Sequence, residues 1–398
     1  MEKINSVPDS LLAPIPWFRQ MQKDNPVFFD SRFTLFSGTT GAWHVFRYED
    51  VAQVFRDHGS FTSAYIPKSA NNVLLGESLI FKDPPDHTKL RKVLSKGLSP
   101  FLVNRMESTV VELTQQMLTP FLEKGEMDFM KDFADLLPLW IVMKILGIRD
   151  EDFEVVKNLS GTILASPEMT RDYEMFFKAQ LEGKQFLEEV IRQHEVEPKN
   201  DFIGILLNSK IEDQSVSVLD MVSLSFSVML GGVESTTAFL GNVMRALITY
   251  PDIQDQVRQQ PADLPAMLNE VLRFYPSIFT FSRVAAKDVE LGGQQIHKGD
   301  FMVPWLGATN FDDAIFPEPD VFDINRKNLG QILNFGHGIH YCPGEAVSRQ
   351  EARAAFGYLL PQLSDIKLKE GAALTLHPST TVNCLKSLPI TFTYNGEK

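Results

Sequence analysis

The chain has 398 residues, of which 44% are hydrophobic and 22% are charged, and this ordinary globular usage excludes an intrinsically disordered chain. The formal net charge of -13 at pH 7 disfavours nucleic acid or an anionic membrane as the main partner. Two cysteines, Cys342 and Cys384, are too few for a disulfide framework or a four-thiolate zinc site, so a reducing cytoplasm is the expected location.

The predicted elements are mostly helices, because apolar residues recur at three- and four-residue spacing over long segments. In chain order, the pattern predicts a strand at 42–46, helices at 88–97, 105–123, 134–147, 172–194, 218–250, 252–259 and 263–274, a hairpin at 289–296, a strand at 301–304, a helix at 345–363 and a strand at 390–393. No repeat, low-complexity run or linker-like segment divides the sequence. We therefore expect a single domain over 1–398 that is mainly α with a small β region.

No membrane anchor is expected. The first residues, MEKINSVPDS, lack the basic and apolar segments of a signal peptide. The predicted helix 218–250 has the length of a membrane span, but polar residues interrupt its apolar sequence. These residues are Glu234, Ser235, Thr236, Thr237 and Asn242. A buried helix explains this composition better, and hydroxyls beside an acid in such a helix can loosen its backbone bonding and admit water.

The segment 335–344, which reads FGHGIHYCPG, is the most informative part of the sequence. Glycines on both sides of Cys342 suit a tight loop that approaches a flat ligand closely. The predicted helix that follows places Cys342 just before a helix N-terminus, where the dipole and the free amides stabilise a thiolate. The alternative is a structural cysteine in a glycine-rich turn. Cys384 has no such surroundings, and we expect it to be a small buried apolar residue.

The spacing Phe-x-x-Gly-x-x-x-Cys-x-Gly in this segment resembles the haem-binding loop of the cytochrome P450 family, soluble bacterial type. The resemblance implies a triangular, mainly α-helical haem-thiolate fold that binds haem b (iron protoporphyrin IX). It implies that Cys342 is the axial metal ligand, that Phe335 packs against the loop and that Gly344 belongs to the cofactor site. Pro343 stands where many members have leucine, and it has no amide hydrogen to donate to the sulfur.

The same resemblance assigns further residues to the haem and to the fold. His87, Arg91, Arg283 and His340 correspond to the groups that bind the two haem propionates, and cations are the expected partners of carboxylates. Glu270 and Arg273 lie three residues apart on one helical face, and they resemble the Glu-x-x-Arg pair of the family. With Arg326 as third partner, they are expected to be structural, since buried charges need mutual pairing.

Residues 231–236 resemble the oxygen-activation motif of the family, in which an acid and a threonine guide protons to bound dioxygen. Glu234 is the acid, and Ser235 occupies the threonine position. The resemblance also places the substrate pocket, with the loop from Tyr65 to Leu79 and the turn at 380–382 contributing to its walls. The remaining predicted wall residues, nearly all apolar, are Phe226, Met229, Leu230, Val233, Ile278, Phe279, Thr280, Thr381 and Val382.

These implications predict a monooxygenase that inserts one oxygen atom of dioxygen into a lipophilic substrate such as a fatty acid, terpenoid, steroid or polyketide. Electrons would come from an acidic ferredoxin or flavodoxin with its NAD(P)H reductase, because the sequence has no nucleotide-binding or iron–sulfur motif. A basic cluster is the expected docking site for this donor, and it contains Lys89, Arg91, Lys92, Lys96, Arg349 and Arg353. Two alternatives are a haem-thiolate enzyme that uses peroxide directly and a non-catalytic haem sensor or ligand-binding protein.

Overall fold

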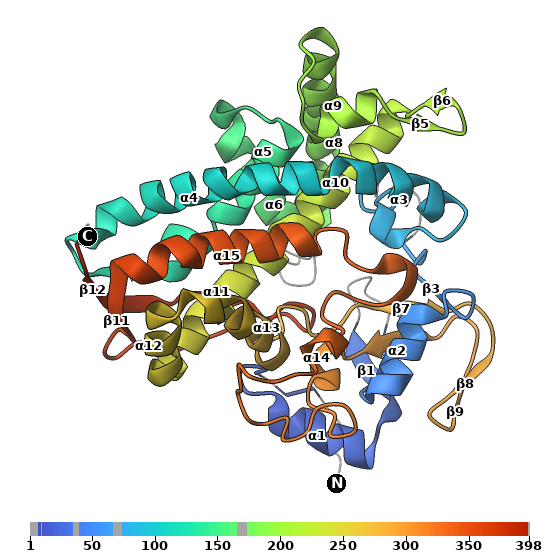
Figure 1. Cartoon of the computed structure of the whole chain (residues 1–398). Helices are drawn as coiled ribbons and strands as arrows, with labels where there is room; N and C mark the ends of the chain where they lie inside the picture. The colour runs from blue at the N-terminus through green and yellow to red at the C-terminus, as the bar shows by residue number, and fades with distance from the viewer. Residues whose placement is uncertain (1–6, 9, 35–39, 67–73, 165–172, 397–398) are drawn as a thin grey trace.

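Helices make up most of the molecule in the computed structural model, which describes residues 7–8, 10–34, 40–66, 74–164 and 173–396 (Figure 1). The α-helices are α1 Ile15–Asp24, α2 Tyr48–Arg56, α3 Asp86–Gly97, α4 Pro100–Leu122, α5 Leu137–Leu146, α6 Phe153–Leu164, α8 Tyr173–Val196, α9 Phe202–Leu207, α10 Val218–Gly232, α11 Glu234–Thr249, α12 Pro251–Gln259, α13 Leu264–Phe274, α14 Leu306–Thr309 and α15 Glu345–Gln362.

The strands form small sheets. A five-stranded sheet has the order β1-β2-β10-β7-β3, and a three-stranded sheet has the order β11-β12-β4. The strands β5–β6 and β8–β9 are separate hairpins. The bounds are β1 Val27–Thr34, β2 Thr40–Val45, β3 Phe61–Thr62, β4 Glu126–Asp128, β5 Lys210–Ile211, β6 Gln214–Ser215, β7 Arg283–Ala285, β8 Val289–Leu291, β9 Gln294–Ile296, β10 Phe301–Pro304, β11 Leu363–Leu368 and β12 Pro389–Tyr394.

The helical part and the sheet part lie on opposite sides of the loop that carries Cys342. Helix α15 runs alongside α4 across the front of the molecule, and α10 and α11 cross behind them (Figure 1). The larger sheet lies with α1 and α2 at the other side, where an aromatic cluster around Trp305 and Phe18 forms its own core. The main apolar core surrounds α10, α11 and α15. The fold agrees with the predicted mainly α class.

The predicted helix 218–250 is the one stretch of the described chain long and apolar enough to cross a membrane, and most of its apolar window is buried inside the protein. The structure therefore supports its interpretation as a core helix. The prediction of one continuous helix is wrong, because α10 ends at Gly232 and α11 begins at Glu234. Val233 between them has φ -89° and ψ -72°, which lies in the right-handed region but is distorted from ideal helical values. Two glycines and a side-chain hydrogen bond from Ser235 explain the break.

The observed helix ends agree best with the predicted ones where the sequence has a capping residue or a proline. Ser217 caps α10 by accepting a hydrogen bond from the amide of Asp220 at 3.1 Å, and its hydroxyl donates to the Asp220 carboxylate at 2.7 Å. Pro251 is the first residue of α12, and Tyr250 alone separates it from the end of α11. The predicted helix 105–123 begins earlier, at Pro100, since Ser99 and Pro100 supply an extended residue followed by a proline in the first turn.

Candidate functional site

The loop before α15 is closed by its own backbone. The amide of Cys342 donates to the carbonyl of Phe335 at 2.8 Å, so the residues between them form a tight ring. Gly336 and Gly338 have φ of 77° and 71°, in the left-handed region. A Cβ on Gly338 would lie 2.8 Å from the carbonyl oxygen of Phe55, so a side chain there would clash with backbone. The two glycines are therefore required by the shape of the loop.

Cys342 lies three residues before the N-terminal residue of α15, Glu345. Desolvation raises the pKa of its thiol, and the backbone amides of Gly344 and Glu345 act in the opposite direction by hydrogen bonding to the sulfur. Arg91 lowers the same pKa through its charge, and its Nη2 donates to the carbonyl of Tyr341 at 2.6 Å. A desolvated thiol of this kind stays ionised when a metal cation binds it.

Four basic side chains from different parts of the chain meet beside this loop. His87 and Arg91 come from α3, Arg283 from β7 and His340 from the loop itself. The rings of His87 and His340 lie 4.2 Å apart between centroids. Desolvation, and after it charge repulsion from Arg283, His87 and Arg91, lowers the pKa of His340 to about 2. The two imidazoles are therefore neutral near pH 7, and Arg91 and Arg283 carry the positive charge of the cluster.

Two buried polar atoms of this cluster lack partners among the described residues. The buried Nε2 atoms of His87 and His340 have no hydrogen-bond partner there. Arg283 is 3% exposed, and its guanidinium lies over the ring of Phe55 at 4.7 Å and donates to the adjacent Ser282 carbonyl at 2.8 Å. Buried cations and unpartnered donors need an anion to compensate them. The cluster therefore fits a ligand with carboxylates.

The helix break brings an acid and a hydroxyl together. The hydroxyl of Ser235 donates to the carbonyl of Gly231 at 2.8 Å, one turn earlier. Burial raises the pKa of Glu234 to about 7, so its carboxyl can hold or release a proton near neutral pH. The next hydroxyls are directed elsewhere, since Thr236 Oγ1 lies 3.4 Å from Ser348 Oγ and Thr237 donates to the Ala134 carbonyl at 3.0 Å.

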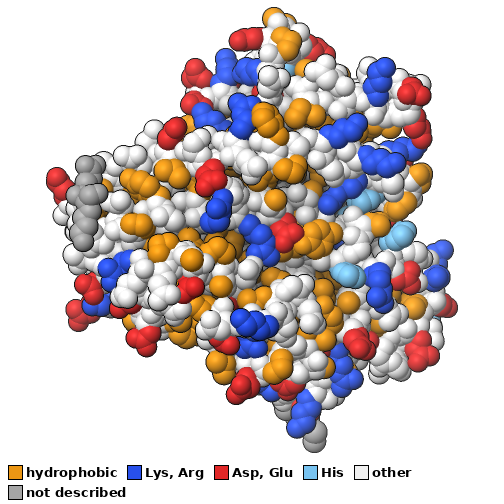
Figure 2. Space-filling view, viewed as in Figure 1, with side chains coloured by type: hydrophobic (Ala, Val, Ile, Leu, Met, Phe, Trp, Pro, Cys, Tyr) orange, Lys and Arg blue, Asp and Glu red, His pale blue; other side chains and the backbone are white. Residues whose placement is uncertain are grey.

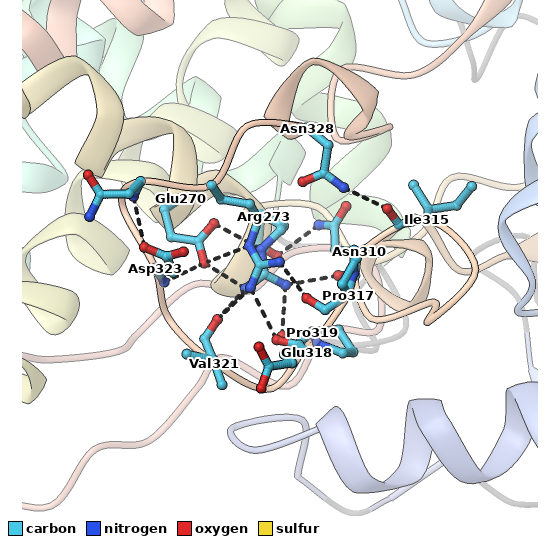
Figure 3. Close-up of polar contacts among 12 residues, drawn as sticks. Glu270, Arg273, Asn310, Ile315, Pro317, Glu318, Pro319, Val321, Asp323 and Asn328 are labelled. Carbon is cyan, nitrogen blue, oxygen red and sulfur yellow. Dashed lines mark hydrogen bonds and ion pairs between the residues drawn. The ribbon is translucent and has the colours of Figure 1, made fainter.

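Glu270 and Arg273 form a fully buried bidentate pair in α13 (Figure 3). Arg273 donates to the two carboxylate oxygens at 2.6 and 2.9 Å and also to the carbonyls of Asn310 and Pro319. The Nε of Arg326 lies 3.6 Å from Glu270 Oε1, and Arg326 donates to the Pro317 carbonyl at 2.6 Å. The three residues therefore tie the segment 310–326 to α13.

The comparisons with known proteins identify the family. The family model for cytochrome P450 matches residues 17–261 and 263–375. The chain belongs to the cytochrome P450 family. It is 30% identical to the putative cytochrome P450 YjiB of Bacillus subtilis over 353 residues, which is 87% of this chain and 86% of that protein.

Solved P450 structures have the same fold. CYP109Q5 from Chondromyces apiculatus is 26% identical, with a TM-score of 0.88 and 98% of each chain covered. CYP109E1 from Bacillus megaterium in complex with testosterone is 26% identical, with a TM-score of 0.84, 95% of this chain covered and 99% of that chain. P450BioI in complex with an acyl carrier protein ligated to hexadec-9Z-enoic acid is 25% identical, with a TM-score of 0.87, 96% of this chain covered and 98% of that chain.

As a P450, the chain is a monooxygenase, an oxidoreductase that uses haem b. The described residues fit this cofactor, because one desolvated cysteine lies beside a basic cluster in which the Nε2 atoms of His87 and His340 have no hydrogen-bond partner. When bound through a thiolate, haem supplies dioxygen activation. A Cβ on Gly344 would meet Cys342 Sγ at 3.9 Å, which is ordinary contact, so this glycine is not required by crowding at the sulfur.

The predicted pocket walls fall into two groups. Phe226, Met229 and Val233 are buried in or next to α10, and Leu230 is half-buried. Ile278 forms an isolated bridge with Val382, and the amide of Phe279 donates to the Thr381 carbonyl at 2.7 Å. Part of the predicted loop wall, residues 67–73, lies outside the described residues.

Two predicted wall residues have other contacts. The ring of Phe279 is fully buried in the aromatic cluster, 6.1 Å from that of Phe18 between centroids. Its side chain therefore contributes to the core behind the Ile278 bridge, since successive side chains of an extended segment alternate. The hydroxyl of Thr280 donates to the Pro304 carbonyl at 2.7 Å, which ties this segment to β10.

Several contacts at the site were not predicted. Thr237 binds the Ala134 carbonyl, and Ser348 faces Thr236. Asn242 donates to two backbone carbonyls in the core. The sequence hinted at this role only by placing a polar residue in an apolar helix. Cys384 is buried as predicted, and burial raises the pKa of its thiol.

Proposed function

We propose that this P450 holds its haem through Cys342 and oxidises a lipophilic substrate with electrons from a separate acidic protein. The observation that carries the haem assignment is the cluster of His87, Arg91, Arg283 and His340 beside the cysteine loop. These side chains would bind the two propionates and offset their charge. Phe335 would support the loop, since its carbonyl accepts from the amide of Cys342 at 2.8 Å. The guanidinium of Arg349 lies 4.9 Å from its ring centroid.

The chain's own groups support proton delivery at the helix break. The carboxyl of Glu234 has a pKa near neutrality, so it can receive a proton from solvent and pass it on. The hydroxyl of Ser235 would form part of the proton path, and its hydrogen bond to the Gly231 carbonyl sets its orientation. These two residues favour the use of dioxygen over direct use of peroxide, which needs no such protonation.

The wall residues support a lipophilic substrate. Phe226, Met229 and Val233 are apolar and buried, and Ile278 and Val382 are held together by backbone bonding. A testosterone complex of CYP109E1 and a fatty-acyl complex of P450BioI are consistent with a substrate of steroid or fatty-acid size. We propose steroids and fatty acids as the first substrate classes to test. We also propose that residues 1–398 form a single domain and that the enzyme works in the cytoplasm.

The basic face over α3 supports docking of an acidic ferredoxin or flavodoxin. Basic side chains gather there above the cysteine loop (Figure 2). A hollow of about 560 Å³ lies between α3 and the β5–β6 hairpin, and it is lined by Lys89, Arg91, Lys92, Val93, Ser95, Lys96, Lys210, Ile211 and Glu212. The cluster stands on a chain of net charge -13, which makes the local charge distinctive.

Spectroscopy of cysteine variants tests the haem assignment. The reduced carbon monoxide complex should show the strongly red-shifted Soret band of thiolate ligation. Cys384→Ala should keep this band and Cys342→Ala should lose it. The reverse pattern would refute the assignment. Turnover with a ferredoxin system, compared with turnover by peroxide alone, separates the dioxygen enzyme from the peroxide enzyme and from a haem protein without activity.

Reduction kinetics test the donor site. The rate of reduction by an acidic ferredoxin should fall as salt rises, because screening weakens surface charge pairs. Lys92→Glu should slow reduction at low salt, whereas Lys178→Glu on the exposed side of α8 serves as the matched charge reversal and should have little effect. Equal rates for both variants, or rates independent of salt, would contradict docking at α3.

A further inference from the structure

A single asparagine connects α11 to two segments of the predicted pocket wall. Asn242 is fully buried, and its Nδ2 donates to the carbonyls of Tyr275 and Asn383, both at 3.2 Å. The amide nitrogen has two hydrogens, and the two bonds use both. Asn242 lies seven residues after Ser235, which is two helical turns and the same side of α11.

The two carbonyls belong to segments that are already joined to each other. The amide of Asn383 donates to the Ser277 carbonyl at 2.9 Å, and its side-chain Nδ2 donates to the Pro276 carbonyl at 3.0 Å. Farther along, Phe279 bonds Thr381 and Ile278 bridges Val382. The segments 275–280 and 381–383 are therefore one hydrogen-bonded unit, and Asn242 ties that unit to the helix that carries Glu234 and Ser235.

This connection cannot be replaced by an apolar side chain. Removing the amide leaves two buried carbonyls with one donor fewer each, and an unsatisfied buried polar group is destabilising. The side chain is short, so the helix and the wall unit stand at a separation fixed by the reach of one asparagine. No charge is involved, so the tie has no dependence on pH or salt.

We infer that Asn242 is a positioning residue that sets the height of the pocket wall above α11, and thereby the shape of the space next to Ser235. This inference rests on the proposed haem site and on the proposed walls at Ile278 and Val382. It adds a residue that contacts neither haem nor substrate. Its effect should therefore depend on the size of the molecule in the pocket.

Two azoles of different size test the inference by binding alone. Imidazole and clotrimazole both bind a haem iron and shift its Soret band, but only clotrimazole is large enough to contact the walls. In the holoenzyme, Asn242→Leu should weaken clotrimazole binding about tenfold, equivalent to ~1.4 kcal/mol, and leave imidazole binding nearly unchanged. Asn383→Leu, which keeps Asn242 and removes the bond to Pro276, should shift the same ratio in the same direction by a smaller amount.

Asn310→Leu is the matched control. Asn310 is equally buried and donates through Nδ2 to the Arg273 carbonyl at 2.9 Å and to Asn334 Oδ1 at 2.7 Å, away from the predicted walls. It should lower stability without changing the ratio of the two azole affinities. An unchanged ratio in both Asn242→Leu and Asn383→Leu, or an equal change in Asn310→Leu, would overturn the inference. A wild-type protein whose Soret band neither azole shifts would overturn the proposed haem site and the inference with it.

Discussion

The hydroxyl of Ser235 donates to the carbonyl of Gly231 at 2.8 Å, across the break between α10 and α11. The bond occupies a carbonyl one turn earlier, and it fixes the serine side chain, which is otherwise freer at χ1 than threonine. Thr236, the next residue, faces Ser348 on α15. The two hydroxyls therefore have different neighbours, and their substitution should have different consequences.

We predict that Ser235 controls how many electrons are lost as peroxide. Ser235→Ala should raise the peroxide formed per NAD(P)H consumed severalfold and leave substrate binding nearly intact. Ser235→Thr should lower the leak, because the extra methyl restricts the hydroxyl. Thr236→Ala should change it little. A leak that rises in Thr236→Ala and not in Ser235→Ala would show that the assignment along α11 is wrong.

Glu234 should make the same leak depend on pH. Burial raises the pKa of its carboxyl to about 7, so the group carries its proton below that pH and loses it above. If the protonated carboxyl supplies protons, peroxide formed per NAD(P)H should increase as pH rises from about 6 to about 8. Glu234→Gln should remove the dependence, and the exposed Glu182→Gln should retain it. A midpoint near the ordinary glutamate pKa would contradict the buried-acid role.

The buried pair in α13 should matter far more than an exposed pair of similar geometry. Arg273→Met leaves the carboxylate of Glu270 buried without its main partner, which typically costs about 3–5 kcal/mol. Arg19 bonds Asp313 at 2.8 Å and Asp320 at 2.7 Å on the surface, and Arg19→Met should cost less than about 1 kcal/mol. Urea denaturation of the two holoenzyme variants measures the difference. Similar midpoints would mean that the α13 pair contributes little.

Local signals predicted the parts of the structure that depend on neighbouring residues. The glycines at 336 and 338 predicted the tight loop, and proline at 251 predicted the end of the long helix. Strand β1 was not predicted, because its burial pattern follows no clear alternation in VFFDSRFT and its register comes from pairing with β2. Strand β11 was not predicted either. It begins directly after α15 with no turn between them, so the spacing of apolar residues did not mark where the helix ends and the strand begins.

Contacts between distant residues were the least predictable. Asn242 binds carbonyls 33 and 141 positions away, and no spacing rule relates it to them. The four basic groups beside Cys342 were found only through the family resemblance, since His87 stands among unrelated charges in the sequence and Arg283 stands alone. Phe279 was predicted to line the pocket because it is apolar and lies between two other predicted wall residues. Its side chain packs in the aromatic core instead. Composition predicts burial, while the partner depends on the folded arrangement.

Glu351 should destabilise the protein at alkaline pH. It lies on α15 with 2% exposure, and its Oε1 has no hydrogen-bond partner among the described residues. Burial raises the pKa of this carboxyl to about 8. Between the ordinary glutamate pKa and that value, the folded state binds more protons than the unfolded state. The free energy of unfolding therefore falls as pH rises through this range, and the full stability is present only below it.

Glu351→Gln should remove this loss, since the amide has nearly the same shape and does not ionise. We expect the variant to be more stable than the wild type by roughly 1–4 kcal/mol above about pH 8, and close to the wild type near pH 5. Glu107→Gln is the matched control, because Glu107 is half exposed on α4 and bonds Arg353 at 3.1 Å across the same helix pair. Its unfolding free energy should follow the wild-type pH profile. If Glu351→Gln is less stable than the wild type at every pH, the carboxylate has an interaction whose stabilisation exceeds the cost of its desolvation.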